Sequence, residues 1–203
     1  MRAFALALAL AASAACAPAA ATTYVFNAFL NGANEVPPNA SPGFGLGKFF
    51  FDDELHTMLV EVDFGDLIGL TTAAHVHAPT AVAGTGNIGV ATELPLFTGF
   101  PTGVHAGTYS HTFDMTLAAS YNPAFITNFG GGTTAGAEAA LIQAAIDGKA
   151  YLNIHSTFAP GGEIRGFLTL VPEPATWALM ILGFGMTGAM LRARHAPARL
   201  DVR

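Results

Sequence analysis

Two short segments hold the side chains of this sequence that are best suited to chemistry. His75 and His77 flank one valine, and on a β-strand residues two apart point to the same face of the sheet. In the segment 151–155 (YLNIH), Asn153 and His155 alternate with apolar residues and therefore point away from the core. Three neutral imidazoles suit Zn²⁺ or Cu²⁺ better than Ca²⁺. If their strands are neighbours, His75, His77 and His155 form one polar cluster, and a copper or zinc site is one of two interpretations of it.

A hydrogen-bonded network is the alternative use of the same side chains. In the segment 163–168 (EIRGFL), Glu163 and Arg165 alternate with apolar residues and are also expected on a face away from the core. In such a network Arg165 pairs with a carboxylate or with backbone carbonyls, while Asn153 and the imidazoles exchange hydrogen bonds that tie loops to the sheet. A His-x-His pair does not decide between the two interpretations. Three further histidines are scattered and expected at the surface: His56, His105 and His111.

Short β-strands must position these side chains. Residues 56–64 show the clearest pattern, with apolar side chains at the even positions from Met58 to Phe64. Further strands are expected at 24–30, 43–52, 73–78, 88–91, 108–115, 150–156 and 163–170. Seven to nine short strands separated by Gly and Pro turns predict a mainly β fold. We expect an antiparallel β-sandwich or flattened Greek-key barrel of the immunoglobulin-like or superoxide-dismutase-like kind, and the sequence does not separate sandwich from closed barrel.

Residues 117–148 depart from the strand pattern and predict an inserted helical hairpin. Asn122 followed by Pro123 is typical of a helix start, and Gly148 fits the position just past a helix end. The apolar side of the second helix is expected at Ala137, Leu141, Ile142, Ala144, Ala145 and Ile146. We expect this hairpin to cap one open end of the sandwich, with a lid over a site as the alternative.

The charge of the chain excludes nucleic acid as a partner. The whole chain has 8 basic and 14 acidic residues, and the region 22–171 has only three basic against twelve acidic ones, a net charge of −9. Nothing basic is therefore present to follow a phosphate backbone. The acidic run 52–54 lacks the ligand spacing of an EF-hand loop.

Residues 1–21 are typical of a secretory signal peptide. A basic start, an apolar stretch and small residues before the cleavage site predict a cut after Ala21. Cys16 offers the alternative of a lipidated cysteine. A cut after Ala21 leaves no cysteine, so a disulfide framework and a thiol nucleophile are both excluded.

The C-terminal residues 172–203 combine a motif, an apolar span and an arginine cluster. Pro172, Glu173 and Pro174 precede the uncharged stretch 175–191, which is about 26 Å long as a helix and predicts a transmembrane span. Arg192, Arg194 and Arg199 follow and should hold that end in the cytoplasm.

This arrangement resembles the PEP-CTERM sorting signal of Gram-negative bacteria. The resemblance implies that an exosortase cuts at Pro172-Glu173-Pro174 after a transient stay in the inner membrane. The product would then lie at the cell envelope surface or outside the cell, beside exopolysaccharide or other surface proteins. A permanent single-span anchor is the alternative with the same topology.

Three blocks of the central region resemble the CHRD domain. They are 31–38 (NGANEVPP), 73–79 (AAHVHAP), and 151–156 (YLNIHS) with 162–166 (GEIRG), in the order of the family. The resemblance implies an extracellular β-sandwich module without an established enzymatic activity. We therefore expect a non-catalytic protein whose partners are the export machinery and the exosortase.

A weaker likeness is to Cu/Zn superoxide dismutase. It implies that His75, His77 and His155 are copper ligands and that Arg165 guides an anionic substrate. The chain departs from that family because the region 22–171 has no cysteine and no His-rich loop for a second metal. Its acidic surface would also repel superoxide. A metal-binding protein with a dismutase-like site is therefore kept as the alternative function.

Overall fold

The computed structural model describes residues 23–172, 181–188 and 192. The expected signal peptide, its cleavage after Ala21, and the motif residues Glu173 and Pro174 lie outside the described residues. Of the expected span at 175–191, residues 181–188 are described and form a helix. Within the described residues, no helix has both the length and the apolar character needed to cross a membrane.

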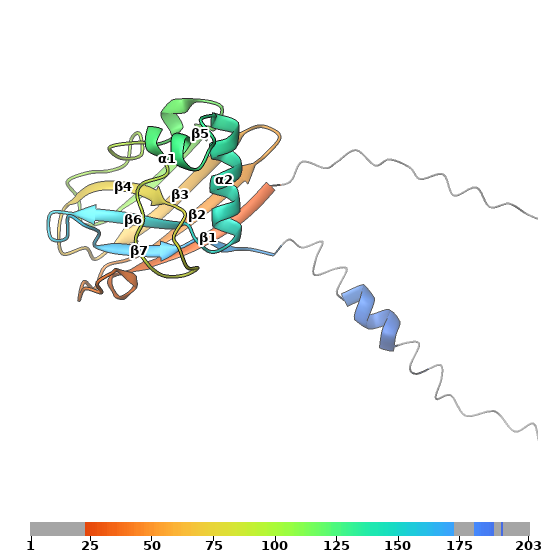
Figure 1. The fold of residues 1–203 in the computed structure, drawn as a ribbon. Coiled ribbons are helices and arrows are strands. Elements are labelled where there is room, and N and C mark those ends of the chain that lie inside the picture. The colour runs from red at the N-terminus through yellow and green to blue at the C-terminus, as the bar shows by residue number, and fades with distance from the viewer. Residues whose placement is uncertain (1–22, 173–180, 189–191, 193–203) are drawn as a thin grey trace, which may run out of the picture.

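In the described part of the chain, eight antiparallel strands build a single, strongly curled sheet. Their bounds are β1 Thr23–Asn31, β2 Phe44–Asp52, β3 Thr57–Gly65, β4 Thr71–His77, β5 Gly107–Asp114, β6 Tyr151–Ser156, β7 Ile164–Phe167 and β8 Thr169–Leu170. The strand order is β4-β6-β7-β1-β2-β3-β5, with β8 also paired to β1. The curl places β4, β6 and β7 in one layer and β1, β2, β3 and β5 in the other (Figure 1). The prediction of a mainly β, antiparallel, sandwich-like fold is confirmed.

The edge of β4 is covered by the long segment that leads to β5. Backbone N–H groups of Thr71 and Phe97 donate to the carbonyls of Val104 and Ala74. This segment satisfies edge groups of β4 that would otherwise remain unpaired. The prediction of a strand at 88–91 is wrong, because this segment forms an isolated β-bridge between His77 and Val90 and no strand.

The core lies between the two layers and follows the period-two pattern. Along β3, Met58, Val60, Val62 and Phe64 are all buried, as the alternation predicts. Gly47 of β2 shows how closely the layers approach, because a Cβ there would lie 2.8 Å from Leu152 Cδ2 of β6. Side chains of β6 therefore fill the space that the glycine leaves.

The helical insertion lies between β5 and β6, as expected. It contains α1 (Pro123–Asn128) and α2 (Thr134–Ile146), preceded by the short 3₁₀ helix η2 (Ala118–Ser120); another, η1 (Gly32–Asn34), follows β1. Asn122 and Thr133 cap the two helices through their side chains, and Gly148 has a positive φ of 66° just past α2. Ile146, expected on the apolar side, is 39% exposed.

Helix α2 packs against the end of the sandwich at the β2–β3 turn (Figure 1). Ala137, Leu141 and Ala145 of this helix belong to the main core. Glu138 is also buried, and its Oε2 lies 2.8 Å from Nδ1 of His56 in that turn. The insertion is thus a packed part of the domain.

Candidate metal centre

The polar side chains singled out in the sequence lie on the outer face of the β4-β6-β7 layer. Asn153 of β6 is directly opposite His75 of β4 on one side and Arg165 of β7 on the other. In the next row, Tyr151 lies opposite His77. Because successive residues of a strand alternate in direction, these five side chains share the face opposite to the core. We call this set, together with His155 and Glu35, the polar layer.

Loops cover the polar layer, so all its side chains except the partly exposed His155 are buried on a face that the sheet alone would leave open. His75 is 6% exposed, His77 9%, Glu35 5% and Arg165 0%. The cover consists of η1 with the residues after it, the segment around Ile88, and the turn 157–162. The alternation of side chains along each strand predicts that these residues lie on the face away from the core. Their burial on that face comes from the covering loops.

The three expected histidine ligands converge. His75, His77 and His155 each offer one ring nitrogen, and these atoms all lie within 4.8 Å of one another. The centre of the His75 ring lies 4.8 Å from the centre of the His77 ring and 4.7 Å from that of the His155 ring. The strand order explains this convergence, because β4 and β6 are direct neighbours.

Two backbone carbonyls fix the protonation of two of these rings. Nδ1 of His77 lies 2.8 Å from the carbonyl of Ile88, and Nδ1 of His155 lies 2.9 Å from the carbonyl of Pro160. A carbonyl oxygen only accepts, so each Nδ1 carries the proton and each Nε2 presents a lone pair. This arrangement is the usual orientation of metal-ligating histidines in proteins.

One buried ring nitrogen of each of these three histidines has no hydrogen-bond partner. Nδ1 of His75 and Nε2 of His77 and His155 are buried without a hydrogen bond. The same holds for Oε1 of Glu35, and for side-chain atoms of Asn153 and Arg165. Buried polar atoms without partners are rare in native proteins and often mark a site for water or an ion. Among the described residues, such atoms are concentrated in the polar layer.

Burial keeps the three imidazoles neutral. It lowers the pKa of His75 to about 3, with the neighbouring His155 and His77 adding to the effect. Burial also lowers the pKa of His77 to about 4 and lowers the pKa of His155. The neutral form is the one that binds metals.

Arg165 is held within the polar layer through its Nε and Nη1 atoms, whereas its Nη2 has no hydrogen-bond partner. Its Nε donates to the carbonyl of Asn34 at 2.6 Å, and its Nη1 donates to the carbonyl of Gly86 at 3.1 Å and to Oδ1 of Asn87 at 2.8 Å. Its guanidinium carbon lies 4.7 Å from the centre of the Tyr151 ring. The role implied by the dismutase likeness, guiding an anion from solvent, needs an exposed guanidinium, whereas Arg165 is fully buried.

Glu163 forms a separate cluster. Its carboxylate accepts hydrogen bonds from Ser41 Oγ at 2.6 Å and from the backbone N–H groups of Ile68 at 2.6 Å and Gly69 at 3.1 Å, and it also accepts from Ser156 Oγ. Burial alone would raise its pKa, but these hydrogen bonds hold the pKa of Glu163 below its usual value. Glu163 therefore fastens two loops to β6, apart from the partners of Arg165.

Sequence reasoning missed two members of the polar layer, Tyr151 and Glu35, and Glu35 is the charged one. Its Oε2 lies 3.4 Å from Nε of Arg165, although the two residues are far apart in the chain. The block 31–38, which resembles the CHRD domain, was the available signal. A lone acidic residue in a loop gives no indication by itself that it is buried.

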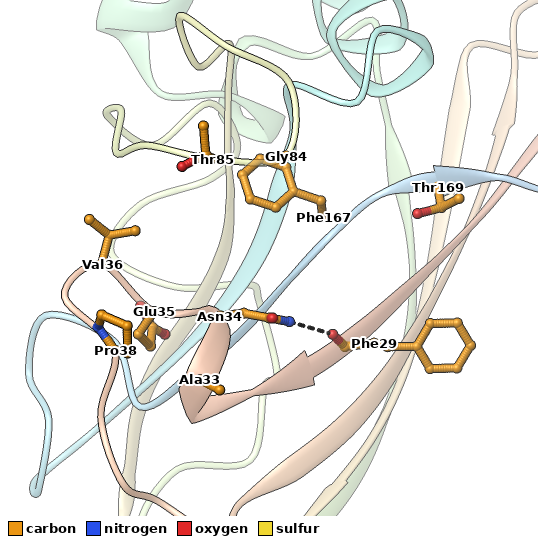
Figure 2. A pocket seen from close by; sticks show the side chains of 10 residues that line it. All are labelled: Phe29, Ala33, Asn34, Glu35, Val36, Pro38, Gly84, Thr85, Phe167 and Thr169. Carbon is orange, nitrogen blue, oxygen red and sulfur yellow. Dashed lines mark hydrogen bonds between the residues drawn. The ribbon is translucent and has the colours of Figure 1, made fainter.

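A pocket of about 530 Å³ borders Glu35. Figure 2 shows Glu35 beside Pro38 at one side of it and Phe29 with Thr169 at the other. The lining residues are Phe29, Ala33, Asn34, Glu35, Val36, Pro38, Gly84, Thr85, Phe167 and Thr169. Nδ2 of Asn34 donates to the carbonyl of Phe29 at 3.2 Å and so fixes η1 against β1.

The burial of Glu35 predicts a pH-dependent contribution to stability. Burial raises its pKa from 4.5 to about 7, against the opposing effect of Arg165. Because the folded protein binds this proton more tightly than the unfolded chain, the contribution is full below pH 4.5 and is lost as the pH rises through about 7.

We expect the free energy of unfolding of the wild type, minus that of Glu35→Gln, to fall by about 1–3 kcal/mol between pH 5 and pH 8. Urea unfolding of both proteins at several pH values measures this difference, and the subtraction removes the titration of the histidines. A difference that does not vary with pH would contradict the assignment.

Comparison with known protein families gives one match that covers the site. The CHRD domain matches residues 26–168, a range that includes the histidines, Glu35, Glu163 and Arg165. No curated protein and no solved structure shows a significant match to the chain. The matched range is well over half of the 203 residues, and the chain therefore belongs to the CHRD domain family.

Proposed function

We propose that the protein is an exported, non-catalytic CHRD module that acts at the cell envelope surface or outside a Gram-negative cell. The positions of the domain ends carry this proposal. Strand β1 begins at Thr23, directly after the expected cleavage at Ala21, and β8 ends at Leu170, just before Pro172. Removal of both terminal signals would thus leave every strand of the domain intact.

The expected partners follow from the same proposal. The export machinery would take the chain across the inner membrane, where the C-terminal span would hold it until an exosortase cuts at Pro172-Glu173-Pro174. The released domain, with its net charge of −9 between residues 22 and 171, would remain soluble. Exopolysaccharide or other surface proteins are its proposed neighbours there.

Replacing Pro172, Glu173 and Pro174 with alanine tests the processing step. We expect the full-length precursor to accumulate in the inner membrane, because the recognition motif is gone while the apolar span remains. Immunoblots of fractionated cells measure this, with Asp201→Asn, which leaves motif and span unchanged, as the control. Normal release of a shortened product from the alanine variant would overturn the proposal of exosortase processing.

Metal binding at the imidazole cluster is the second candidate function. One ring nitrogen of each histidine lies within 4.8 Å of the other two, and each ring also has a buried nitrogen without a partner. Both observations favour metal binding, and copper or zinc is the proposed ion. A dismutase-like redox activity gains less support, because Arg165 is buried and paired. Metal binding would add to the role of an exported module without replacing it.

A further inference from the structure

We propose that one copper or zinc ion is held by Nδ1 of His75, Nε2 of His77 and Nε2 of His155, and that this ion clips two loops to the sheet. The inference rests on the second candidate function and extends it by naming the ligand atoms and the effect of the ion. The loops are the segment 86–91, which includes Ile88, and the turn 157–162, which includes Pro160.

The choice of ligand atoms follows from the hydrogen bonds of the rings. His77 and His155 use Nδ1–H to donate to carbonyls, so only Nε2 remains for a ligand. On His75, Nδ1 is the buried nitrogen without a partner. Nε2 of His77 and Nε2 of His155 therefore present unused lone pairs, and Nδ1 of His75 presents a third when its proton lies on Nε2.

The spacing of these nitrogens requires a small adjustment on binding. Zinc or copper bound to imidazole nitrogens at about 2.0–2.1 Å in a tetrahedral site keeps those nitrogens about 3.3–3.4 Å apart. The largest distance between these nitrogens, 4.8 Å, therefore has to shrink by up to about 1.5 Å, which rotation of the side chains can supply. The ligand set consists of three neutral imidazoles, so it favours copper or zinc over calcium or magnesium.

The unpartnered lone pairs give the physical reason for the site. Leaving a buried acceptor without a hydrogen bond destabilises a fold by about 1–3 kcal/mol. Here two such acceptors, Nε2 of His77 and Nε2 of His155, lie with the unpartnered Nδ1 of His75 on two adjacent strands. One ion satisfies all three at once, whereas protonation would bring like charges together in a buried cluster.

The effect on the loops follows from the second ring nitrogen, Nδ1, of His77 and of His155. A metal on Nε2 fixes the ring and makes its Nδ1–H a better donor to the carbonyl behind it. Those carbonyls belong to Ile88 and Pro160, and both loops cover the polar layer. Fixing His77 and His155 should therefore hold both loops more tightly and slow their opening.

The experiment combines metal content with hydrogen exchange on the purified protein. After removal of metal with a chelator, the protein is given Cu²⁺ or Zn²⁺, passed over a desalting column and analysed for bound metal by mass spectrometry. Amide exchange is then followed in peptides covering 86–91 and 157–162, with and without the ion. We expect one ion per chain and at least a threefold slower exchange in both loops.

Two variants and a matched control separate metal binding from general folding. His75→Gln and His77→Gln should each lose the bound ion, and circular dichroism shows whether they remain folded. His105→Gln is the control, because Nδ1 of His105 also contacts a carbonyl, that of Leu67 at 2.9 Å, but lies outside the cluster. This variant should keep both the ion and the slowed exchange.

The outcomes distinguish the inference from the function on which it rests. Stoichiometric metal that leaves loop exchange unchanged would overturn the clip and keep metal binding. Absence of stoichiometric metal in a folded wild type would overturn both. Equal loss of metal in His105→Gln and His75→Gln would refute the assigned ligands.

Discussion

Replacing Arg165 with methionine is expected to lower the free energy of unfolding by about 3–5 kcal/mol. The methionine retains much of the volume but removes the positive charge that opposes the raised pKa of the buried Glu35, so ionisation of this carboxyl becomes still more costly. It also removes the donors to the carbonyls of Asn34 and Gly86 and to the side chain of Asn87. Urea unfolding monitored by circular dichroism measures the loss.

A double-mutant comparison tests the cause of this effect. In the background of Glu35→Gln, Arg165→Met should be less harmful, because no charge remains buried without a partner. Arg165→Lys should not restore stability, since an ammonium cannot reproduce the fork of the guanidinium that reaches three acceptors. Full stability in the lysine variant would show that only the positive charge matters at this position.

Replacing Glu163 with alanine is expected to lower the free energy of unfolding by about 3–4 kcal/mol. The carboxylate is fully buried and accepts four hydrogen bonds, two from hydroxyls and two from backbone N–H groups. Hydrogen bonds to a charged acceptor are stronger than neutral ones, and all four donors lose their partner together. Thermal and urea unfolding both measure the change.

Two further variants place bounds on the Glu163 effect. Glu163→Gln keeps one acceptor oxygen and should lose less stability, whereas Glu54→Ala, an exposed acidic residue in the β2–β3 turn, should change it by less than about 0.5 kcal/mol. Because the folded pKa of Glu163 is lowered, its contribution is present above pH 4.5 and is lost on acidification. A Glu163→Ala protein as stable as the Glu54→Ala control would show that the hydrogen bonds of Glu163 add little.

Local patterns in the sequence determined which face each strand residue occupies and where the helices begin. The alternation around Met58 and Ile154 places the core side, because a pleated strand repeats every two residues. The caps at Asn122 and Gly148 are equally local, since a helix end is satisfied by residues within one turn of it. The CHRD resemblance also came from short blocks, and the family match confirms it.

Longer-range features of the site were decided only by the tertiary structure. The sequence named His75, His77 and His155 as candidates, but their convergence depends on β4 pairing with β6, which are separated by β5 and the helical insertion. Strand order is set by the global packing of the sandwich, and periodicity within one strand carries no information about its neighbour.

The burial of the polar layer is the clearest feature that the sequence did not predict. Nothing local distinguishes a polar residue facing water from one facing a loop that folds over it, so Glu35 escaped notice and Arg165 could be imagined as exposed. The structure brings η1, the segment around Ile88 and the turn at Pro160 over the same face. The sequence by itself thus determined which polar side chains lie on that face. Only the tertiary structure decided that loops cover them, because burial depends on contacts between residues far apart in the chain.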